Sequence, residues 1–214
     1  MASIRERNLE AIVEAASREF AQRGFQAARI EEIAAQAGVP KANVHYYFQT
    51  KRTLYLAVLE KVMAPLAGAF QALDPQASPE SALRRYIRAK LDVCRHQPHA
   101  VRVMLGELLH GAHHLPRARS EEVRGLAHKA VACLRGWMDQ GLIERTEPEH
   151  LLLFIWSTTL AHVRFADIPQ AGQLNWPVQD ASLQAMVRML TRMVLGECAS
   201  AAGPVPGKPA QYAI

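Results

Sequence analysis

The sequence predicts an all-α fold of about nine helices, divided into a small N-terminal unit and a larger C-terminal helical domain. Apolar residues recur at helical spacing along nearly the whole chain, and strand signals are almost absent. Proline, glycine and capping residues separate the periodic stretches. With 214 residues, half of them apolar, the chain is long enough to bury a core without disulfides.

Three short helical stretches open the chain. The first should end at Gly24. Its apolar face consists of Leu9, Ile12, Val13, Ala16 and Phe20. The second is expected at residues 29–37, where a glycine stops it. The third covers residues 41–47, because Pro40 suits a first helical turn, where its missing N–H costs little.

The later helices are expected at residues 51–65, 79–97, 99–111, 120–140, 148–165 and 180–197. Thr50 can cap the first of these, and Pro65 should kink or end it. The helix at 148–165 is apolar nearly all round, so both of its faces should be covered. The expected domains are residues 1–50, residues 51–198 and a disordered tail at residues 199–214.

The amino-acid composition narrows the class of binding partner, the cellular compartment and the kinds of metal site that the chain can form. A net charge of +5 agrees with a nucleic-acid partner but does not single one out. The three cysteines are far apart and form no CxxC pair, which argues for a reducing compartment and against a thiolate metal site. The most apolar stretch, at 151–163, is too short to span a bilayer, and no signal peptide opens the chain. We therefore expect a cytoplasmic protein with no membrane partner and no cofactor.

Three short helices with a glycine-bounded turn before the third form a helix-turn-helix, which places a reading helix in the DNA major groove. Lys41 can donate to a guanine edge or a phosphate, and Asn43 can pair bidentately with adenine. Lys51 starts the next helix, where free N–H groups already attract an anion. The side chains predicted to contact DNA are Arg29, Lys41, Ala42, Asn43, His45, Tyr46, Tyr47 and Lys51. Spacing alone leaves open another kind of α-protein with Tyr46 or Tyr47 in its core.

A longer pattern covers the same region. It runs through Gly24–Phe25, Ile30-x-x-Ile33–Ala34, Ala37–Gly38–Val39-x-Lys41 and Tyr47–Phe48-x-x-Lys51-x-x-Leu54. This pattern resembles the signature of the tetracycline-repressor (TetR) family. The resemblance implies a dimeric all-α repressor, with an N-terminal domain that binds an operator and a C-terminal domain that binds an inducer. Two positions depart from the family: Ala28 replaces a frequent capping Thr or Ser, and His45 replaces a frequent phosphate-binding Tyr.

A second pattern extends through much of the remaining chain. It consists of Val44–Phe48, Leu54–Leu59, Tyr86–Leu91, Glu107-x-Leu109-x-Gly111 and Ile155–Trp156-x-x-Thr159. This pattern resembles the RutR-type regulators of pyrimidine utilisation. The resemblance implies a uracil- or thymine-like effector, in a pocket where Trp156 stacks on the ligand or walls it.

One position of that pocket departs from the pattern. Leu160 stands where the RutR-type helix has Gln, a group suited to a pyrimidine's amide edge. The predicted ligand-binding residues are Glu107, Trp156, Thr159, Leu160 and His162, and Arg164 can also replace the missing amide. Core packing stays an alternative for Trp156 and His162. A different effector, such as a drug or a metabolite, also stays open.

Metal binding and catalysis are two other classes of function. His110, His113 and His114 can share a helix face, as metal ligands do, but they fall at a helix end with no clear fourth ligand, so we predict no metal site. No nucleophile–base pair, phosphate loop or pair of catalytic carboxylates stands out, so an enzyme is not expected. A pure dimerisation module is the remaining alternative, and it needs no operator.

The last two predicted helices, the eighth and the ninth, are expected to pair with those of a second copy in a four-helix interface. The apolar stripe from Leu183 to Val194 and the apolar helix at 148–165 motivate this prediction. A symmetric homodimer presents two reading helices about 34–36 Å apart, so the double-stranded operator should be a near-palindrome. Helix 51–65 joins the two domains and should transmit effector binding.

Overall fold

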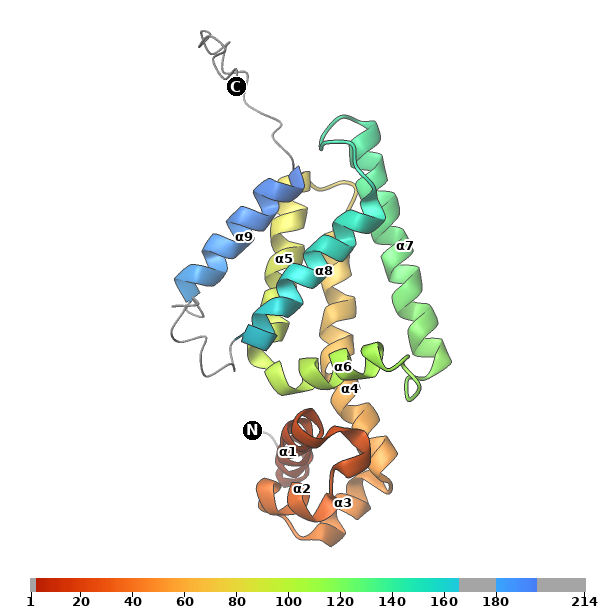
Figure 1. Ribbon diagram of the computed structural model, residues 1–214, viewed down its shortest axis with the longest axis vertical. Helices are drawn as coiled ribbons and strands as arrows, with labels where there is room; N and C mark the ends of the chain where they lie inside the picture. Colours follow the sequence, from red (N-terminus) through yellow and green to blue (C-terminus); the bar gives the residue numbers. More distant parts are fainter. Residues whose placement is uncertain (1–2, 166–179, 196–214) are drawn as a thin grey trace, which may run out of the picture.

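The protein is described here by a computed structural model that covers residues 3–165 and 180–195. Every secondary-structure element in these two ranges is helical. Helices α1 to α3 form a small unit at one end of the molecule, and α5 and α7 to α9 form the body at the other (Figure 1). Helix α4 runs from one part into the other, and α6 lies between them (Figure 1). The predicted division into two helical parts agrees with this arrangement.

The N-terminal unit comprises α1 (Ile4–Ala27), α2 (Ile30–Ala37) and α3 (Lys41–Phe48). Gly24 interrupts the helical backbone of α1 with φ of +72°, a conformation that glycine adopts without steric cost. Gly38 closes α2 in the left-handed region with φ of +67°. These glycines therefore set the turns that position α3.

Helix α4 (Lys51–Ala69) corrects the expectation that Pro65 ends it. Thr50 caps the helix as predicted, accepting a hydrogen bond from the Thr53 backbone. Pro65 is exposed, while Leu66 and Ala69 beyond it are buried. Packing of this last turn against the core compensates for the backbone hydrogen bond that proline removes.

The C-terminal part comprises the 3₁₀ turn η1 (Phe70–Ala72), α5 (Pro79–His96), α6 (Pro98–Leu109), α7 (Arg117–Asp139), α8 (Pro148–Phe165) and α9 (Asp180–Leu195). Both ends of α8 agree with the prediction. Helix α7 begins at Arg117 rather than Ser120, because Pro116 serves as its N-cap. The loop expected at 166–179 and the tail expected at 199–214 lie outside the described residues.

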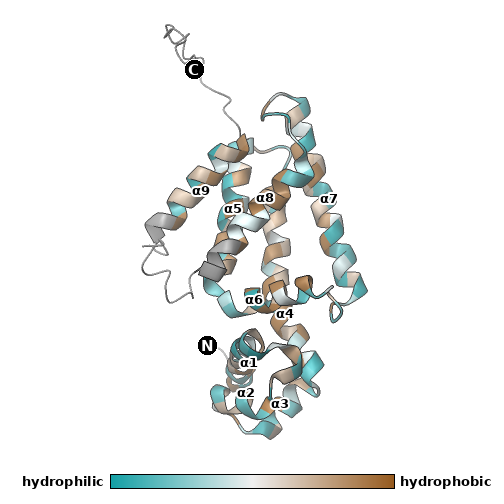
Figure 2. Ribbon diagram, in the orientation of Figure 1, coloured by the Kyte–Doolittle hydropathy of each residue, from teal (hydrophilic) through white to brown (hydrophobic). Residues whose placement is uncertain are grey.

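Two clusters of buried side chains form the core. One joins α1 to α4 with α6, and the other joins α5, α7, α8 and α9 around Tyr86, Leu134 and Trp137. Apolar residues gather on α4 and α8, which run through the middle of the C-terminal part (Figure 2). Residues 51–72 are long and apolar enough to cross a membrane by length and composition alone, but Leu54 and Val58 are fully buried in this core.

The apolar stripe of α9 packs inside its own chain, which corrects the reason given for placing it in a dimer interface. Leu183, Val187, Leu190 and Val194 are all buried in the second core cluster. Helix α9 has α5 as its main partner, which explains why this face is covered without a second copy. The exposed large apolar residues of α8 and α9 are instead Leu153, Phe154, Met189 and Met193.

Candidate DNA interface and effector site

The exposed face of α3 is the candidate reading surface. Lys41, Ala42 and His45 are exposed there, and Asn43 is half-buried. Val44 is buried on the opposite face and fixes the rotation of the helix. The N-terminus of α3 has no side-chain cap, so its first N–H groups can donate hydrogen bonds to an anionic partner. The structure thus brings together the predicted base-reading residues.

Lys41 is paired in the free protein. Its ammonium lies 2.5 Å from Oε1 of Glu31 on α2, and both side chains are about half exposed. The hydrogen bond from Lys41 holds the pKa of the Glu31 carboxyl below its usual value. An exposed pair of this kind is weak enough to be exchanged for a DNA contact.

Of the residues predicted to contact phosphate, Tyr46 and Tyr47 lie on α3 and Arg29 lies at the start of α2. The rings of Tyr46 and Tyr47 meet edge to face, with 5.2 Å between their centroids, and Tyr46 is 76% exposed. Aromatic side chains of a protein core are mostly buried. The exposed Tyr46 is therefore not a core residue, which was the alternative left open by spacing alone. Arg29 is exposed at the N-cap of α2, while Ala28 before it is buried.

Lys51 has a structural role that the sequence did not show. Its ammonium donates to the carbonyl oxygens of Gln26 at 3.0 Å and Ala28 at 3.1 Å. It also lies 5.0 Å from the centre of the Phe25 ring. Lys51 therefore ties the end of α1 to the start of α4, and its contact with phosphate stays a prediction.

Glu107, which was predicted to bind the ligand, lies where the two parts of the chain meet. It is buried, accepts a hydrogen bond of 3.0 Å from the Tyr55 hydroxyl and lies 2.9 Å from Nδ1 of His114. The backbone N–H of His114 donates to its other oxygen at 2.6 Å. Burial raises the pKa of Glu107, but the hydrogen bonds from His114 and Tyr55 outweigh it, so the pKa lies below its usual value.

Aromatic rings enclose this carboxylate. The ring of Phe25 lies 4.9 Å from that of Tyr55 and 4.4 Å from that of His114, centre to centre. Phe25 belongs to α1, Tyr55 to α4, and His114 to the loop between α6 and α7. Three segments from both parts of the chain therefore meet at one packed point.

A cavity of about 350 Å³ lies between α4, α6, α7 and α8. Its walls are Met63, Leu66, Ala67, Phe70, Met104, Leu108, Ala112, Leu115, Ser120, Val123, Arg124 and Trp156. Most of these side chains are apolar, and the volume falls within the range of small-molecule sites. Trp156 therefore lines this cavity, whereas Glu107 lines a separate cavity of about 490 Å³ together with Phe25, Tyr55 and His114. The ligand-binding roles of both residues stay predictions.

Lys90 is a buried cation beside Trp156 that sequence reasoning missed. It is only 1% exposed, and its ammonium lies 4.1 Å from the centre of the Trp156 ring. Burial lowers the pKa of Lys90 to about 8. The hydroxyl of Tyr86, one helical turn away on α5, is buried with no hydrogen-bond partner among the described residues. The helical spacing of the sequence could have indicated a buried lysine, because Lys90 lies on the apolar face of α5 with Leu83, Tyr86 and Ile87.

Comparison with known proteins assigns the chain to a family. Residues 12–58 match the model of bacterial regulatory proteins of the tetR family, and residues 59–201 match that of the C-terminal region of YcdC-like proteins. The regulator RutR of Escherichia coli K12 is 36% identical over 157 residues, which cover 73% of this chain and 74% of RutR. This chain belongs to the TetR family. It is a transcriptional regulator, as are these relatives, and not an enzyme.

Other TetR regulators agree with this assignment. The repressor NicS of Pseudomonas putida is 33% identical over 138 residues, or 64% of each chain. The crystal structure of PfmR from Thermus thermophilus superimposes with a TM-score of 0.67 over 91% of this chain and 97% of PfmR, at 20% identity. The latter likeness shows that the fold is that of TetR regulators. Such regulators bind operator DNA and ligands and act as dimers.

The other predicted effector residues have defined places in this TetR fold. Thr159 is fully buried, and its hydroxyl donates to the Ile155 carbonyl oxygen at 2.7 Å, so only its lone pairs remain for a ligand. Leu160 is buried in the core cluster that includes Cys94. The side chain of His162 lies outside the described residues.

The three histidines near the end of α6 turn to different neighbours. His114 faces Glu107, while Nδ1 of His110 lies 2.6 Å from the Gly106 carbonyl oxygen. His113 is exposed. Across residues 3–165 and 180–195, no three His, Cys, Asp or Glu side chains are placed to hold a metal ion together.

Proposed function

We propose that this TetR regulator represses a catabolic operon in the cytoplasm and releases its near-palindromic operator when a pyrimidine such as uracil or thymine binds the C-terminal domain. The observation that carries the choice of ligand is the buried ammonium of Lys90 against Trp156. The sequence resemblance to regulators of pyrimidine utilisation supports the same ligand class.

A buried lysine and a buried hydroxyl without hydrogen-bond acceptors are costly to keep in a core. Lys90 and Tyr86 together offer donors at a spacing of one helical turn. A pyrimidine carries two carbonyl oxygens on a flat ring, so it can accept from these donors while it stacks on Trp156. A ligand of this class would satisfy groups that have no hydrogen-bond acceptor among the residues that the structure describes.

Trp156 must change position when such a ligand binds. It lines the 350 Å³ cavity, whereas Lys90 is not among the lining residues. A ligand that enters from the cavity therefore reaches the ammonium only if the indole ring rotates or shifts. This movement replaces the contact between the Lys90 cation and the indole with a hydrogen bond to the ligand.

A second candidate effector is an apolar drug or metabolite. The cavity walls are mostly aliphatic, and Leu160 adds a buried apolar side chain where an amide was expected. An apolar ligand would fill the cavity without disturbing Lys90. The two candidates differ in whether binding depends on the ammonium.

In this proposal, effector binding changes the affinity for operator DNA by way of α6. Met104 and Leu108 of α6 line the cavity, and Glu107 between them bonds Tyr55 of α4. Helix α4 starts directly after α3, so a shift of α6 that disturbs this contact changes the position of the reading helix. The effector acts only to the extent that it binds the released conformation more tightly.

We further propose that the homodimer forms through α8 and α9, with different contacts from those first expected. Leu153 and Phe154 on α8 and Met189 and Met193 on α9 are exposed in the single chain. A paired interface would cover these side chains and keep the two reading helices one DNA turn apart. The buried apolar stripe of α9 stabilises the fold of the single chain and takes no part in this interface.

Tryptophan fluorescence and calorimetry test the choice of effector. Uracil and thymine should bind the wild-type protein and change its tryptophan emission. Lys90→Met, which keeps the apolar volume of the side chain, should abolish this binding, whereas the exposed Lys129→Met on α7 should not. If uracil and thymine fail to bind the wild-type protein, or bind Lys90→Met equally well, the pyrimidine proposal is wrong and the apolar candidate is favoured.

A further inference from the structure

A second cavity lies on the outer side of the C-terminal part, in the groove between α5 and α9. Its volume is about 550 Å³, within the size range of small-molecule sites. Four arginines of α5 and one of α9 line it, against the single carboxylate of Asp92. This groove is separate from the effector cavity, since the two share no lining residue.

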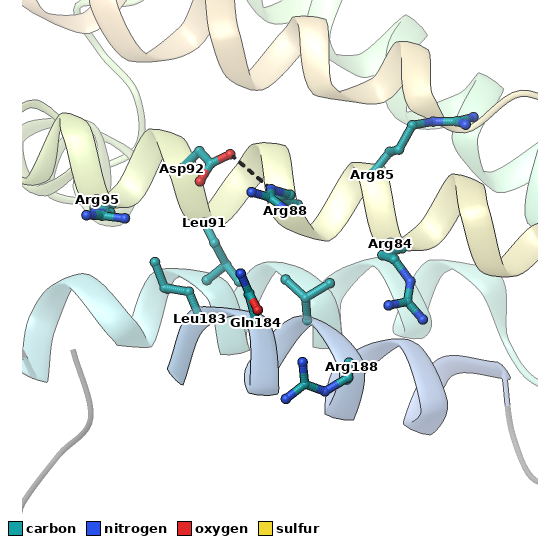
Figure 3. A pocket seen from close by; sticks show the side chains of 10 residues that line it. Arg84, Arg85, Arg88, Leu91, Asp92, Arg95, Leu183, Gln184 and Arg188 are labelled. Carbon is teal, nitrogen blue, oxygen red and sulfur yellow. Dashed lines mark ion pairs between the residues drawn. The ribbon is translucent and has the colours of Figure 1, made fainter. Parts of the chain in front are cut away.

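Arginines line the groove from both helices. Arg84 points from α5 toward α9, and Arg188 stands on α9 across from it (Figure 3). Arg84 and Arg88 are four residues apart on one helix, an arrangement in which like charges repel. An anion between α5 and α9 would relieve this repulsion.

Internal partners neutralise the charges of Arg84 and Arg88 only weakly. The ion pair of Arg88 with Asp92 spans 3.9 Å, and that of Arg84 with Glu80 is an exposed pair within one helix. Exposed pairs of this kind contribute little and exchange readily. Arg188 forms no ion pair or hydrogen bond with any other residue that the structure describes. Its guanidinium is therefore available to a ligand.

The floor of the groove is apolar. Leu91 of α5 and Leu183 of α9 lie between the arginines (Figure 3), and Val187 completes the floor. A guanidinium binds phosphate oxygens through two parallel hydrogen bonds, and an aliphatic floor suits a flat or apolar body. The α3 reading helix lies at the other end of the molecule, so contact with the operator does not account for this charge (Figure 1).

We propose that the α5–α9 groove binds a small phosphorylated ligand of the nucleotide class, with its phosphate between Arg84 and Arg188 and its body on Leu91 and Leu183. The site is distinct from the effector site around Lys90. It gives the regulator a second input that depends on a phosphate group.

Isothermal titration calorimetry on the full-length protein tests this site with uridine monophosphate, uridine and inorganic pyrophosphate. Uridine monophosphate should bind, and pyrophosphate should bind more weakly. Uridine should not bind once Lys90→Met has removed binding of the pyrimidine ring at the effector site. The double variant Arg84→Gln/Arg188→Gln should weaken nucleotide binding by about tenfold or more, because it removes two charge-assisted contacts. Arg117→Gln, which changes an arginine that is 93% exposed on α7, should leave it unchanged. Thermal unfolding of each variant checks the fold.

Repeating the titration in Lys90→Met separates the two sites, since nucleotide binding should persist there even if the effector proposal fails. The inference is overturned if no phosphorylated probe binds, or if the double variant binds as the wild type does. It is also overturned if uridine binds Lys90→Met as well as its monophosphate does. Displacement of the nucleotide by a non-operator DNA duplex would instead make the groove a polyanion surface and contradict a small-molecule site.

Discussion

The Tyr55 hydroxyl donates a hydrogen bond of 3.0 Å to Oε2 of Glu107, and this bond joins α4 to α6. Helix α4 follows the reading helix, and α6 lines the proposed effector cavity. The bond is buried, where hydrogen bonds are stronger and their loss is costly. It is therefore a specific connection through which the two parts of the chain can influence each other.

Tyr55→Phe should uncouple effector binding from operator release. The substitution removes one hydrogen bond to a buried carboxylate and should lower the free energy of unfolding by about 1–3 kcal/mol. Effector affinity in calorimetry should stay near the wild-type value, because Tyr55 does not line the cavity. Operator release should need a higher effector concentration. An unchanged release curve would show that coupling takes another route.

Lys90→Met should stabilise the protein, and the gain should depend on pH. Burial lowers the pKa of Lys90 from 10.5 to about 8, which corresponds to about 3 kcal/mol of destabilisation when the group must be charged in the fold. Between these two pH values the unfolded chain binds the extra proton, so wild-type stability rises with pH. Denaturant unfolding should show the full advantage of Lys90→Met below pH 8 and little of it near pH 10.5. An advantage that does not change with pH would mean that Lys90 is not held in a desolvating site.

Lys51→Ala should destabilise the N-terminal unit by about 1–3 kcal/mol, since two carbonyl oxygens lose their charged donor. Thermal unfolding checks this effect. Operator titrations at several salt concentrations test the phosphate contact separately, because a lost phosphate contact flattens the salt slope by about 1. An unchanged slope would restrict Lys51 to its structural role. Asn43→Ala should differ in kind, by losing preference at particular base pairs.

Leu153→Asp on α8 should break the dimer, because it places a carboxylate in the proposed apolar contact. Light scattering at micromolar concentration should show a dimer for the wild type and a monomer for this variant. Leu109→Asp is the matched control, since Leu109 is 80% exposed on α6 and lies outside α8 and α9. A wild-type monomer, or a dimeric Leu153→Asp, would place the interface elsewhere.

Local signals predicted the fold well. Pro148 defined the start of α8, and the glycine turns defined α2 and α3, because these features act within a few residues of the backbone. Pro65, expected to kink or end α4, does not end it, because tertiary packing of Leu66 and Ala69 overrides its local effect. The stripe of α9 was also assigned to the wrong partner, because an apolar face does not reveal whether its own chain or a second copy covers it.

The site was predicted less completely. The exposed face of α3 followed from the turn before it. Trp156 lines a cavity, and its contact with a ligand stays a prediction. The position of Glu107 depends on contacts between distant segments, which spacing in one sequence does not contain. The burial of Lys90 could have been predicted from the sequence. A lysine on the apolar face of a helix means either that the helix was assigned wrongly or that the charge is buried.

Fluorescence anisotropy with a labelled fragment from the region upstream of the gene, titrated with the protein in the absence and presence of uracil or thymine, tests the central claim most directly. The account predicts tight, salt-dependent binding of this fragment over a scrambled one, and release when uracil or thymine is added. Binding of neither fragment would contradict the operator assignment. Tight operator binding that neither pyrimidine changes would contradict the proposed effector.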